Sequence, residues 1–587
     1  MFLGLNIGHD CGAAITDENG KVIFAVAEER ISRTKMHSGL PVESIALLNK
    51  FYDINKIRTI VIGNNENLDT ELLRRILADS DKSMYRKHGL NLPVTPGLRI
   101  PTNSKTVRKN FFSAINNLVG SDKEIVLTKH HDGHLGCAIG VANYGETALL
   151  LSLDGKGDGE SGAVSSLKNN SSGSVSKYSE HARFPTLDSF GLLYNAVTKA
   201  YNFKPVFHDG KITGLAAYGN YSAAVDILLK YVIVKDGIPT IKQARNLKDR
   251  FLRKGLKHIG FEKFAKKNLD EIVSLAEAST VNYPDLAFAI QEVLEKSVIE
   301  IVSHWQRKLN CQTLALSGGV FANVKLNQKL SELELFNDVR IFPNMGDGGI
   351  ALGGVWFELF KKGELSKGPL FENMFLAPDI SPNEEATLGG FKLKSNLSFE
   401  QIEAKNMPSC IASLLYKGEV GALHKGKMEF GPRALCNRSI LADPRDNAIN
   451  KVINDRLQRT EFMPFAPVVK IENFTKYFEL PPKQSIFPFK YMTMTCKVKK
   501  RFVEVFPGVV HVDQTARPQV IERSEDEFTW EILNEFEKLT GVGILVNTSF
   551  NVHEEPINFK LDDSVEALER NAVDFLVYNS YIIRAKF

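Results

Sequence analysis

Hydrophobic positions along the chain fall into short apolar runs, separated by turn residues, and into a few long periodic segments. Phe2–Ile7 is the first run and predicts a strand that ends at the turn Gly8–Gly12. Ala13–Thr16 and Lys21–Ala27 predict two further strands, because the Asn-Gly pair in Asp17–Gly20 is a strong hairpin signal. The chain therefore opens with a predicted antiparallel sheet.

Similar apolar runs recur as far as residue 342 and predict buried strands. They lie at Thr59–Ile62, Glu124–Thr128, Ala148–Leu153, Thr313–Leu316 and Val339–Phe342. Between them, apolar residues recur every three or four positions from Leu286 to Val302, which is the spacing of one buried helix face. Strands mixed with helices over this length predict an α/β architecture.

A change of composition near residue 370 predicts a boundary between two domains. Charged and turn-forming residues dominate from Lys361 to Pro382. A new helix–strand unit follows, with a helix over Pro408–Lys417 and a strand over Val420–His424. We therefore predict domains at residues 1–370 and 371–587.

The charge balance argues against a general attraction to nucleic acid or to membranes. Lys and Arg number 73 and Asp and Glu 69, a formal net charge of +4 over 587 residues. No apolar run approaches the roughly 20 residues of a membrane-spanning helix, and the first residues lack the basic stretch of a signal peptide. Six scattered cysteines form no C-x-x-C pair. We expect a cytoplasmic enzyme with neither nucleic acid nor membrane as partner.

A pair of histidines just after the strand at 124–128 is a candidate metal site. His130 and His134 are four residues apart, so a helix there would place both imidazoles on one face. His131 stands where a zinc metalloprotease needs Glu, which disfavours that class. Taken alone, the pair fits a structural role equally well.

Two aspartates extend this candidate site. Asp154 closes the strand at 148–153 and Asp347 follows the strand at 339–342, both beside glycines, where α/β proteins often hold ligands. Either one alone is equally typical of a turn or helix cap. Two imidazoles and two carboxylates together suit a borderline divalent ion such as Fe, Mn or Zn.

Two glycine-rich segments are candidate phosphate sites. Gly318, Gly319 and Asn323 lie where a strand passes into a helix, a geometry in which backbone N–H groups can cradle phosphate. The run Gly210–Gly219 is predicted to form a second glycine loop, in which Lys211 could meet a phosphate. A tight turn that packs helices explains that run equally well.

The segment Gly426–Leu441 holds the densest pattern of candidate anion ligands. Arg433 and Arg438 follow a turn fixed by glycine and proline, and guanidinium groups bind phosphate oxygens in pairs. Arg517 and the polar strand end Asn547–Asn551 lie further on. A single arginine is more often part of a surface ion pair, but several in braced turns favour an anion pocket.

Together these segments resemble the O-carbamoyltransferase family, whose members modify nodulation factors, cephamycin, tobramycin and ansamycin antibiotics. The resemblance runs in order through nearly the whole chain, and its most specific part is Glu429–Ile440. The matching segments are Gly4–Asn6, His9-Asp10, Ala27–Arg30, His130–His134, Asp154-Gly155, Gly214–Ala216, Ser317–Val320, Glu429–Leu435, Pro464–Pro467, Arg517–Gln519 and Asn547–Asn551.

The resemblance implies a two-domain enzyme. Its N-terminal domain is expected to have an actin/hexokinase-like (ASKHA) fold with a metal site, and its C-terminal domain a YrdC-like α/β fold. Carbamoyl phosphate and ATP with Mg²⁺ would form carbamoyl-adenylate in the C-terminal domain. The carbamoyl group would then pass to the metal site and onto a hydroxyl of a natural product or sugar. A homodimer is compatible with this scheme.

The resemblance also implies roles for individual residues. By motif, His130, His134, Asp154 and Asp347 match Fe²⁺ ligands, another divalent metal being an alternative, and His9 with Asp10 match the catalytic position beside the transferred group. The residues expected to bind carbamoyl phosphate and nucleotide are Gly155, Lys211, Gly318, Gly319, Asn323, Arg433, Arg438, Ser439, Arg459, Arg517, Asn547 and Ser549.

Three positions depart from the family pattern. Leu457 and Met463 stand where members often carry Lys and Arg ahead of Pro464, and Arg456 is a candidate to replace part of that charge. Cys436 stands where glycine is usual. Two alternatives stay open: an actin-fold kinase, which would release ADP without carbamoyl phosphate, and a non-catalytic acceptor-binding module. The sequence does not identify the acceptor.

Overall fold

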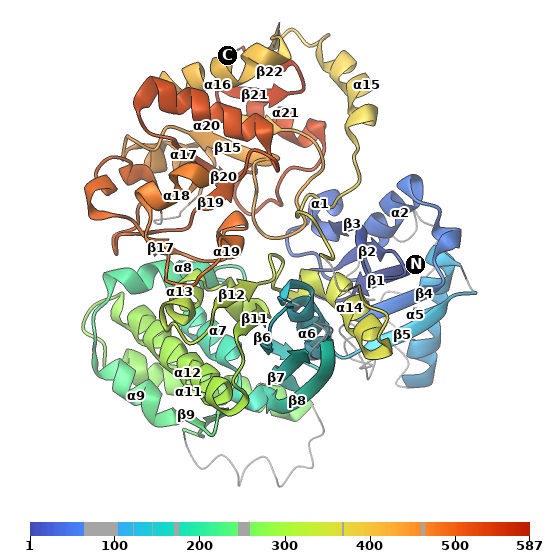
Figure 1. The fold of residues 1–587 in the computed structure, drawn as a ribbon, viewed down its shortest axis with the longest axis vertical. Coiled ribbons are helices and arrows are strands. Elements are labelled where there is room, and N and C mark those ends of the chain that lie inside the picture. Colours follow the sequence, from blue (N-terminus) through green and yellow to red (C-terminus); the bar gives the residue numbers. More distant parts are fainter. Residues whose placement is uncertain are drawn as a thin grey trace. The chain divides into compact units, whose positions relative to one another are not determined.

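The computed structural model describes residues 1–63, 104–120, 122–143, 145–169, 175–244, 259–366, 369–459 and 464–586 (Figure 1). Packing divides the chain into two compact units. Unit 1 comprises Met1–Thr128, Asp347–Leu480 and Ile486–Phe587, and unit 2 comprises Lys129–Gly346 and Pro481–Ser485. Both units combine separate segments of the chain, so they do not test the predicted boundary near residue 370, which stays a prediction.

The first sheet of unit 1 is built from five strands in the order β3-β2-β1-β4-β5. β1 pairs antiparallel with β2 and parallel with β4, β3 adds antiparallel to β2, and β5 adds parallel to β4. The predicted strands are confirmed to within one residue at each end. Their bounds are β1 Phe2–Asn6, β2 Gly12–Thr16, β3 Val22–Ala27, β4 Thr59–Gly63 and β5 Glu124–Thr128.

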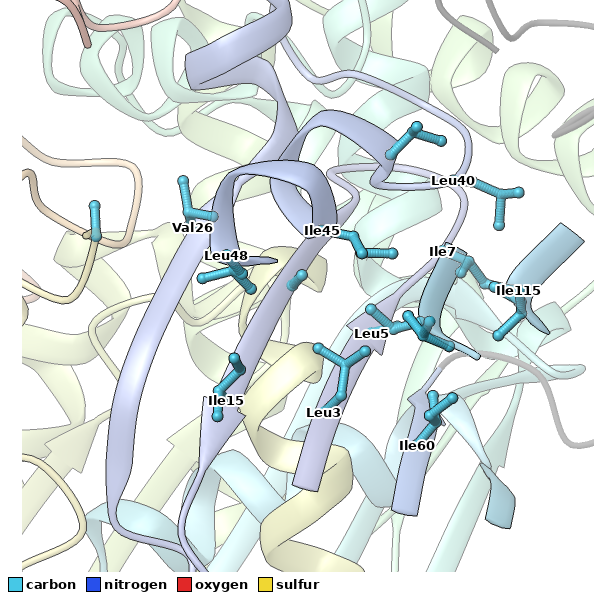
Figure 2. Packing of buried hydrophobic residues seen from close by; sticks show 14 of the residues in the cluster. Leu3, Leu5, Ile7, Ile15, Val26, Leu40, Ile45, Leu48, Ile60 and Ile115 are labelled. Carbon is cyan, nitrogen blue, oxygen red and sulfur yellow. The ribbon is translucent and has the colours of Figure 1, made fainter. Parts of the chain in front are cut away.

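A hydrophobic core covers this sheet (Figure 2). Leu3, Leu5 and Ile60 from the strands belong to this cluster together with Ile45 and Leu48 of α2 (Val42–Phe51). Helix α5 (Ser104–Val119) adds Ile115 to the same cluster, and α14 (Ile350–Lys362) also packs on β1. A Cβ added at Gly4 would lie 1.7 Å from the Ala351 carbonyl oxygen, so this glycine permits the close approach of α14 to β1.

Unit 2 contains a five-stranded sheet in the order β12-β11-β6-β7-β8. In chain order, β6, β7 and β8 form an antiparallel meander, and β11 and β12 then add in parallel on the other side of β6. The first sheet has the same topology. This duplication agrees with the predicted actin/hexokinase-like fold, and the α/β prediction is confirmed. The bounds are β6 Ala148–Gly157, β7 Glu160–Asn169, β8 Val175–Pro185, β11 Thr313–Ser317 and β12 Asp338–Ile341.

Helices cover the sheet of unit 2 and support its loops. Helix α6 (His130–Val141) packs on β6 and β11. The long helix α12 (Asp285–Leu309) buries the predicted face between Leu286 and Val302. The other helices of this unit are α7 Phe190–Ala200, α8 Asp209–Leu215, α9 Ala223–Tyr231, α11 Ile259–Glu277 and α13 Val324–Glu332.

The C-terminal part of unit 1 is a second α/β layer, built on an eight-stranded sheet in the order β13-β22-β21-β14-β15-β20-β16-β19. Helices α16 (Met407–Tyr416) and α20 (Glu527–Thr540) pack against each other and contribute to a core with this sheet. The strands are β13 Leu397–Gln401, β14 Gly421–His424, β15 Arg438–Ala442, β16 Ala466–Lys470, β19 Gln519–Ile521, β20 Ile544–Ser549, β21 Phe575–Tyr578 and β22 Tyr581–Ala585.

Two local predictions were wrong. Asp154 does not end a strand: β6 continues to Gly157, and its pairing with β7 shifts register between Leu153 and Gly157. The segment around Lys211 is the helix α8 and not a glycine loop. Residues 81–110 contain seven Lys or Arg against one Asp, a composition that predicts either a solvated surface loop or a lid that contacts the acceptor; up to residue 103 this segment lies outside the described residues.

In the part of the chain that the structure describes, no helix combines the length and the apolar character needed to cross a bilayer.

Glu28, the first residue of helix α1 (Glu28–Ser32), gives a testable pH dependence of stability. Its carboxylate is fully buried and accepts the N–H groups of Glu43 and Ser44 at 2.8 and 2.7 Å, at the start of α2. Burial raises its pKa from 4.5 to about 7, so the folded state binds this proton more tightly than the unfolded chain.

Stability contributed by Glu28 is therefore fully present below pH 4.5 and declines as the pH rises to 7, by at most about 3 kcal/mol. Glu28→Gln should remove this slope, because the amide does not ionise. It should also weaken the helix cap by about 1 kcal/mol, since an amide –NH₂ cannot accept an N–H group. Urea unfolding between pH 5 and 8 measures both effects, and an unchanged slope in the variant would contradict the assignment.

Candidate functional site

The structure brings His130, His134, Asp154 and Asp347 together. One ligand atom from each residue lies within 4.8 Å of all the others. The Nε2 atoms of His130 and His134 are 3.2 Å apart, and Asp154 Oδ2 is 3.4 Å from His130 Nε2. Ligands bonded to one metal at about 2.1 Å would be separated by roughly 3.0–3.4 Å, so these spacings fit a shared divalent ion.

Each ligand is carried by an element that fixes its direction. His130 and His134 occupy the first turns of α6, where the four-residue spacing aligns them as predicted. Asp154 lies on β6 at its register shift with β7. Asp347 directly follows Gly346, which ends the longer segment of unit 2, and begins a short 3₁₀ turn over Asp347–Gly349.

Neighbouring polar groups orient these ligands. Ser317 Oγ lies 3.3 Å from His134 Nδ1, on the ring edge opposite Nε2. The Gly319 N–H donates to Asp154 Oδ1 at 2.7 Å, which leaves Oδ2 toward the histidines. Asp158 Oδ2 accepts the N–H of His130 at 2.8 Å. Such contacts are typical of the outer partners of metal-binding side chains.

The glycines at this site allow close packing. A Cβ at Gly157 would lie 2.0 Å from His130 Cγ, and one at Gly318 would lie 2.1 Å from the Leu153 carbonyl oxygen. Gly318 has a φ of 106°, a backbone conformation that favours glycine. Gly155 accepts the Ser189 hydroxyl at 2.6 Å through its carbonyl. Gly155, Gly318 and Gly319 therefore shape the site through their backbone.

Electrostatics at this site favour an ionised Asp154 carboxylate. Burial opposes ionisation of Asp154, but its contact with His130 and the nearby histidines outweigh this and lower its pKa. Burial lowers the pKa of His131, whose Nδ1 lies 2.9 Å from Ser152 Oγ. An ionised carboxylate is the form in which aspartate binds a metal ion.

His9 and Asp10 lie in unit 1, on the turn between β1 and β2. His9 Nδ1 is 3.1 Å from Asp10 Oδ2, and both side chains are partly exposed. The buried Asn6 amide donates to the carbonyl groups of His9 and Asp10 at 2.9 and 3.0 Å. Burial, opposed by His9 and assisted by the charges of Glu29 and Asp347, raises the pKa of Asp10.

Asn323 and Lys211 belong to a largely buried polar region of unit 2. Asn323 caps α13 through the Leu326 N–H and donates to Gln291 Oε1 at 2.8 Å. Lys211 is 5% exposed, and its Nζ lies 5.6 Å from the centre of the Phe203 ring. Their assignment to nucleotide stays a prediction.

Arg433 and Arg517 form the clearest anion site among the described residues. Both side chains are only partly exposed, the Nε atom of each is buried without a partner, and no residue that the structure describes forms a hydrogen bond or ion pair with either guanidinium. Burial lowers the pKa of Arg433 to about 10. Burial and the charge of Arg433 lower the pKa of Arg517 well below its usual range. Two neighbouring cations without counter-ions suit an anionic ligand.

A buried amide pair lies beside these arginines. Asn547 Nδ2 donates to Gln519 Oε1 at 2.5 Å and to the Ala434 carbonyl at 3.2 Å, whereas its Oδ1 is buried and unpartnered. An unpartnered buried acceptor suits a ligand that carries an N–H donor. A small cavity alongside is lined in part by Leu435 and Gln519.

Cys436 lies in this layer with a φ of 77°, which explains the preference for glycine at this position in the resembling family. Its Sγ is 3.4 Å from Gln519 Oε1 and 3.6 Å from Asn547 Nδ2. Burial raises the pKa of the thiol well above its usual range. The thiol is therefore a packing group and not a nucleophile.

The remaining predicted anion ligands are engaged with protein atoms. Arg438 is 1% exposed and donates to the carbonyl groups of Lys425, Gly426 and Asn437 at 2.7–3.3 Å. The Ser439 hydroxyl accepts the Cys436 N–H at 2.9 Å. Arg438 thus stabilises the β14–β15 hairpin, and we leave it out of the anion pocket proposed below.

Arg459 holds the end of β20. It donates to Thr548 Oγ1 and to the carbonyl groups of Ser549 and Asn551 at 3.0–3.1 Å. Arg456, the candidate substitute for the missing charges, forms an ion pair with Asp574 at 2.9 Å. Leu457 is fully buried, and Met463 lies outside the described residues.

Several supporting residues received no role from the sequence. Asn6, Ser317 and Gln519 lie within matching motifs, but only the fold reveals which groups their side chains contact. Arg30 of α1 is the fourth such residue, and its Nη2 donates to the Gly431 carbonyl at 2.7 Å. Of these residues, Asn6 alone carried a signal in the sequence, because it is a polar residue in an otherwise apolar strand.

Comparison with known proteins matches two family models along the chain. Residues 1–355 match the model described as Carbamoyltransferase N-terminus, and residues 412–585 match Carbamoyltransferase C-terminus.

Curated relatives cover nearly the whole chain. Nodulation protein NolNO of Sinorhizobium fredii is 30% identical over 98% of this chain and 79% of that protein. An uncharacterized protein of Methanocaldococcus jannaschii, MJ1058, is 30% identical over 98% of each chain. Nodulation protein NolO of Bradyrhizobium diazoefficiens is 30% identical over 78% of this chain and 79% of that protein.

Proposed function

The chain belongs to the carbamoyltransferase family, and from this we propose that it carbamoylates a hydroxyl of a natural product or sugar, using carbamoyl phosphate and ATP. Family membership makes it a transferase. The donor, the adenylate intermediate, the metal and the acceptor class are the proposed part.

The observation that carries the proposal is that Arg433 and Arg517, two neighbouring cations near Asn547, have no counter-ion among the described residues. Carbamoyl phosphate joins a dianionic phosphate to an amide that donates N–H groups. Two guanidinium groups without counter-ions match the phosphate, and the unpartnered Asn547 Oδ1 matches the amide. We assign these three residues to the donor pocket.

The proposed reaction balances in two stages. Water releases phosphate from carbamoyl phosphate, and a carbamate oxygen then attacks the α-phosphorus of ATP, so that pyrophosphate leaves and carbamoyl-adenylate forms. An acceptor hydroxyl next attacks the carbamoyl carbon, and AMP leaves. Mg²⁺ would accompany ATP in the first stage.

The metal quartet belongs to the second stage. A divalent ion, which we propose to be Fe²⁺, would supply Lewis acidity toward the carbamoyl oxygen or the acceptor hydroxyl. His130, His134, Asp154 and Asp347 would hold it. His9 would accept the proton of the acceptor hydroxyl, with Asp10 orienting the imidazole through Nδ1.

The test is carbamoyl-phosphate-dependent release of pyrophosphate from ATP, followed by mass spectrometry of a panel of hydroxylated acceptors. We expect pyrophosphate only when carbamoyl phosphate and ATP are both present. We also expect an acceptor that is heavier by one carbamoyl group in place of a proton. ADP formation without carbamoyl phosphate would instead indicate an actin-fold kinase. If none of these products forms, the remaining alternative is a non-catalytic acceptor-binding module.

A further inference from the structure

Helix α1 lies between the His9–Asp10 turn and the turn that carries Arg433, all within unit 1. It begins directly after β3, and the Glu28 N–H donates to the Cys11 carbonyl at 2.9 Å. Two residues later, Arg30 donates through Nη2 to the Gly431 carbonyl at 2.7 Å. A helix of five residues therefore touches one functional turn through its backbone and the other through a side chain.

The Arg30 side chain is held rigidly. It is 5% exposed, and its Nη1 pairs with Glu29 Oε1 at 2.9 Å. Glu29 is itself fixed, because its Oε2 accepts the Met36 N–H at 2.7 Å. The two arms of the guanidinium thus join a fixed carboxylate of α1 to the Gly431 carbonyl.

The receiving turn is also rigid on its inner side. Glu429 Oε1 accepts the N–H groups of Leu435, Asn437 and Arg438 at 2.7–3.2 Å. The Phe430 N–H donates to the Met374 carbonyl at 2.8 Å. Gly431 has a φ of 151° and precedes Arg433 by two residues. A hydrogen bond to the Gly431 carbonyl therefore restrains the backbone that carries Arg433.

We propose that Arg30 is a positioning residue for anion binding at Arg433, and that it fixes this turn relative to the His9–Asp10 turn. The proposal rests on the donor pocket proposed above. Without Arg30, the turn would have to be ordered when the anion binds, and that cost would appear in affinity. Loss of one charge-assisted hydrogen bond corresponds to roughly a tenfold change in Kd.

Arg33, at the end of α1, offers a matched control. It donates to the carbonyl groups of Ile557 and Pro556 at 2.9 and 3.0 Å and to Asn558 Oδ1 at 3.2 Å. It therefore ties the same helix to the C-terminal part of unit 1 without touching the Gly431–Arg433 turn through any of these contacts. A change at Arg33 should lower stability as much as one at Arg30.

The experiment compares wild type, Arg30→Met and Arg33→Met as full chains by calorimetric titration with inorganic phosphate and with carbamoyl phosphate. We expect Arg30→Met to raise both Kd values about tenfold, and Arg33→Met to leave them within twofold at a similar drop in Tm. Arg30→Lys should restore less than half of the loss, because a single ammonium cannot form both contacts.

Equal Kd values for Arg30→Met and wild type, or equal increases in both variants, would overturn the inference. Failure of the wild type to bind phosphate would also overturn it, since no anion site would exist. Phosphate binding without carbamoyl-phosphate-dependent pyrophosphate release would refute the proposed function only, and the phosphate titration would still decide the role of Arg30.

Discussion

His134→Ala should remove the metal and abolish transfer while leaving formation of the adenylate intact. His134 supplies one of two imidazole nitrogens 3.2 Å apart, and its loss leaves one imidazole and two carboxylates, a donor set that suits a borderline divalent ion less well. Outer partners of metal ligands alone are worth about 10–100-fold in affinity, so we expect at least a 100-fold loss for the ligand itself. Metal content per chain, measured by mass spectrometry, and pyrophosphate release together separate the two stages.

His131 provides the matched control for this experiment. It lies between the two ligands and is equally buried, but its Nδ1 faces Ser152. In His131→Asn the amide nitrogen can take the place of Nδ1, so metal content should stay near that of the wild type. Ser317→Ala should give an intermediate loss of about tenfold in metal affinity, because it removes the hydroxyl at His134 Nδ1. Full metal content in His134→Ala would contradict the assignment of the four residues as metal ligands.

The elements of the fold were accessible from sequence because their signals are local. The strand at Glu124–Thr128 coincides with its apolar run, and the buried face of α12 follows the three-and-four spacing from Leu286 to Val302. The pairing of the strands was not accessible from these signals. The repeated sheet order in units 1 and 2 depends on contacts between segments far apart in the chain.

The candidate metal site was predicted because its chemistry is marked by residue type. His130 and His134 share a helix face at a spacing visible in the sequence, and Asp154 and Asp347 stand beside glycines just after apolar runs. What the sequence does not contain is the direction of each polar group. The Gly319 N–H was expected to face phosphate, yet it donates to Asp154, because the register of β11 beside β6 places the two side by side.

Arg433 and Arg438 show the same limit more sharply. Both follow one braced turn, and the sequence treats them alike as anion ligands. In the fold, Arg438 begins β15 and its donors meet the carbonyl groups of Lys425 and Gly426 across the hairpin. Arg433 remains in the loop before the strand, where no carbonyl group of the described residues accepts a hydrogen bond from it. Whether an arginine binds ligand or backbone therefore depends on strand pairing, which its neighbours in sequence do not encode.

Arg517→Met should weaken carbamoyl phosphate binding and stabilise the fold at the same time. Arg517 lies beside Arg433, the described part of the chain gives it no counter-ion, and burial and the charge of Arg433 both lower its pKa. Removing it deletes one charge-assisted contact to the ligand, worth about 1.5–3 kcal/mol or a 10- to 100-fold increase in Kd. It also relieves repulsion in the free protein, which should raise the free energy of unfolding by about 1 kcal/mol.

Arg523→Met is the control for the change in charge. Arg523 lies six residues further on, is more exposed and pairs with Glu527 and Glu531, so its loss should alter neither Kd nor Tm appreciably. Titration calorimetry and thermal unfolding, each with and without carbamoyl phosphate, measure both quantities. The ligand should raise the Tm of the wild type and of Arg523→Met, but not that of Arg517→Met at the same concentration. A lower Tm of free Arg517→Met with unchanged Kd would mean that the two cations are structural, and that the donor binds elsewhere.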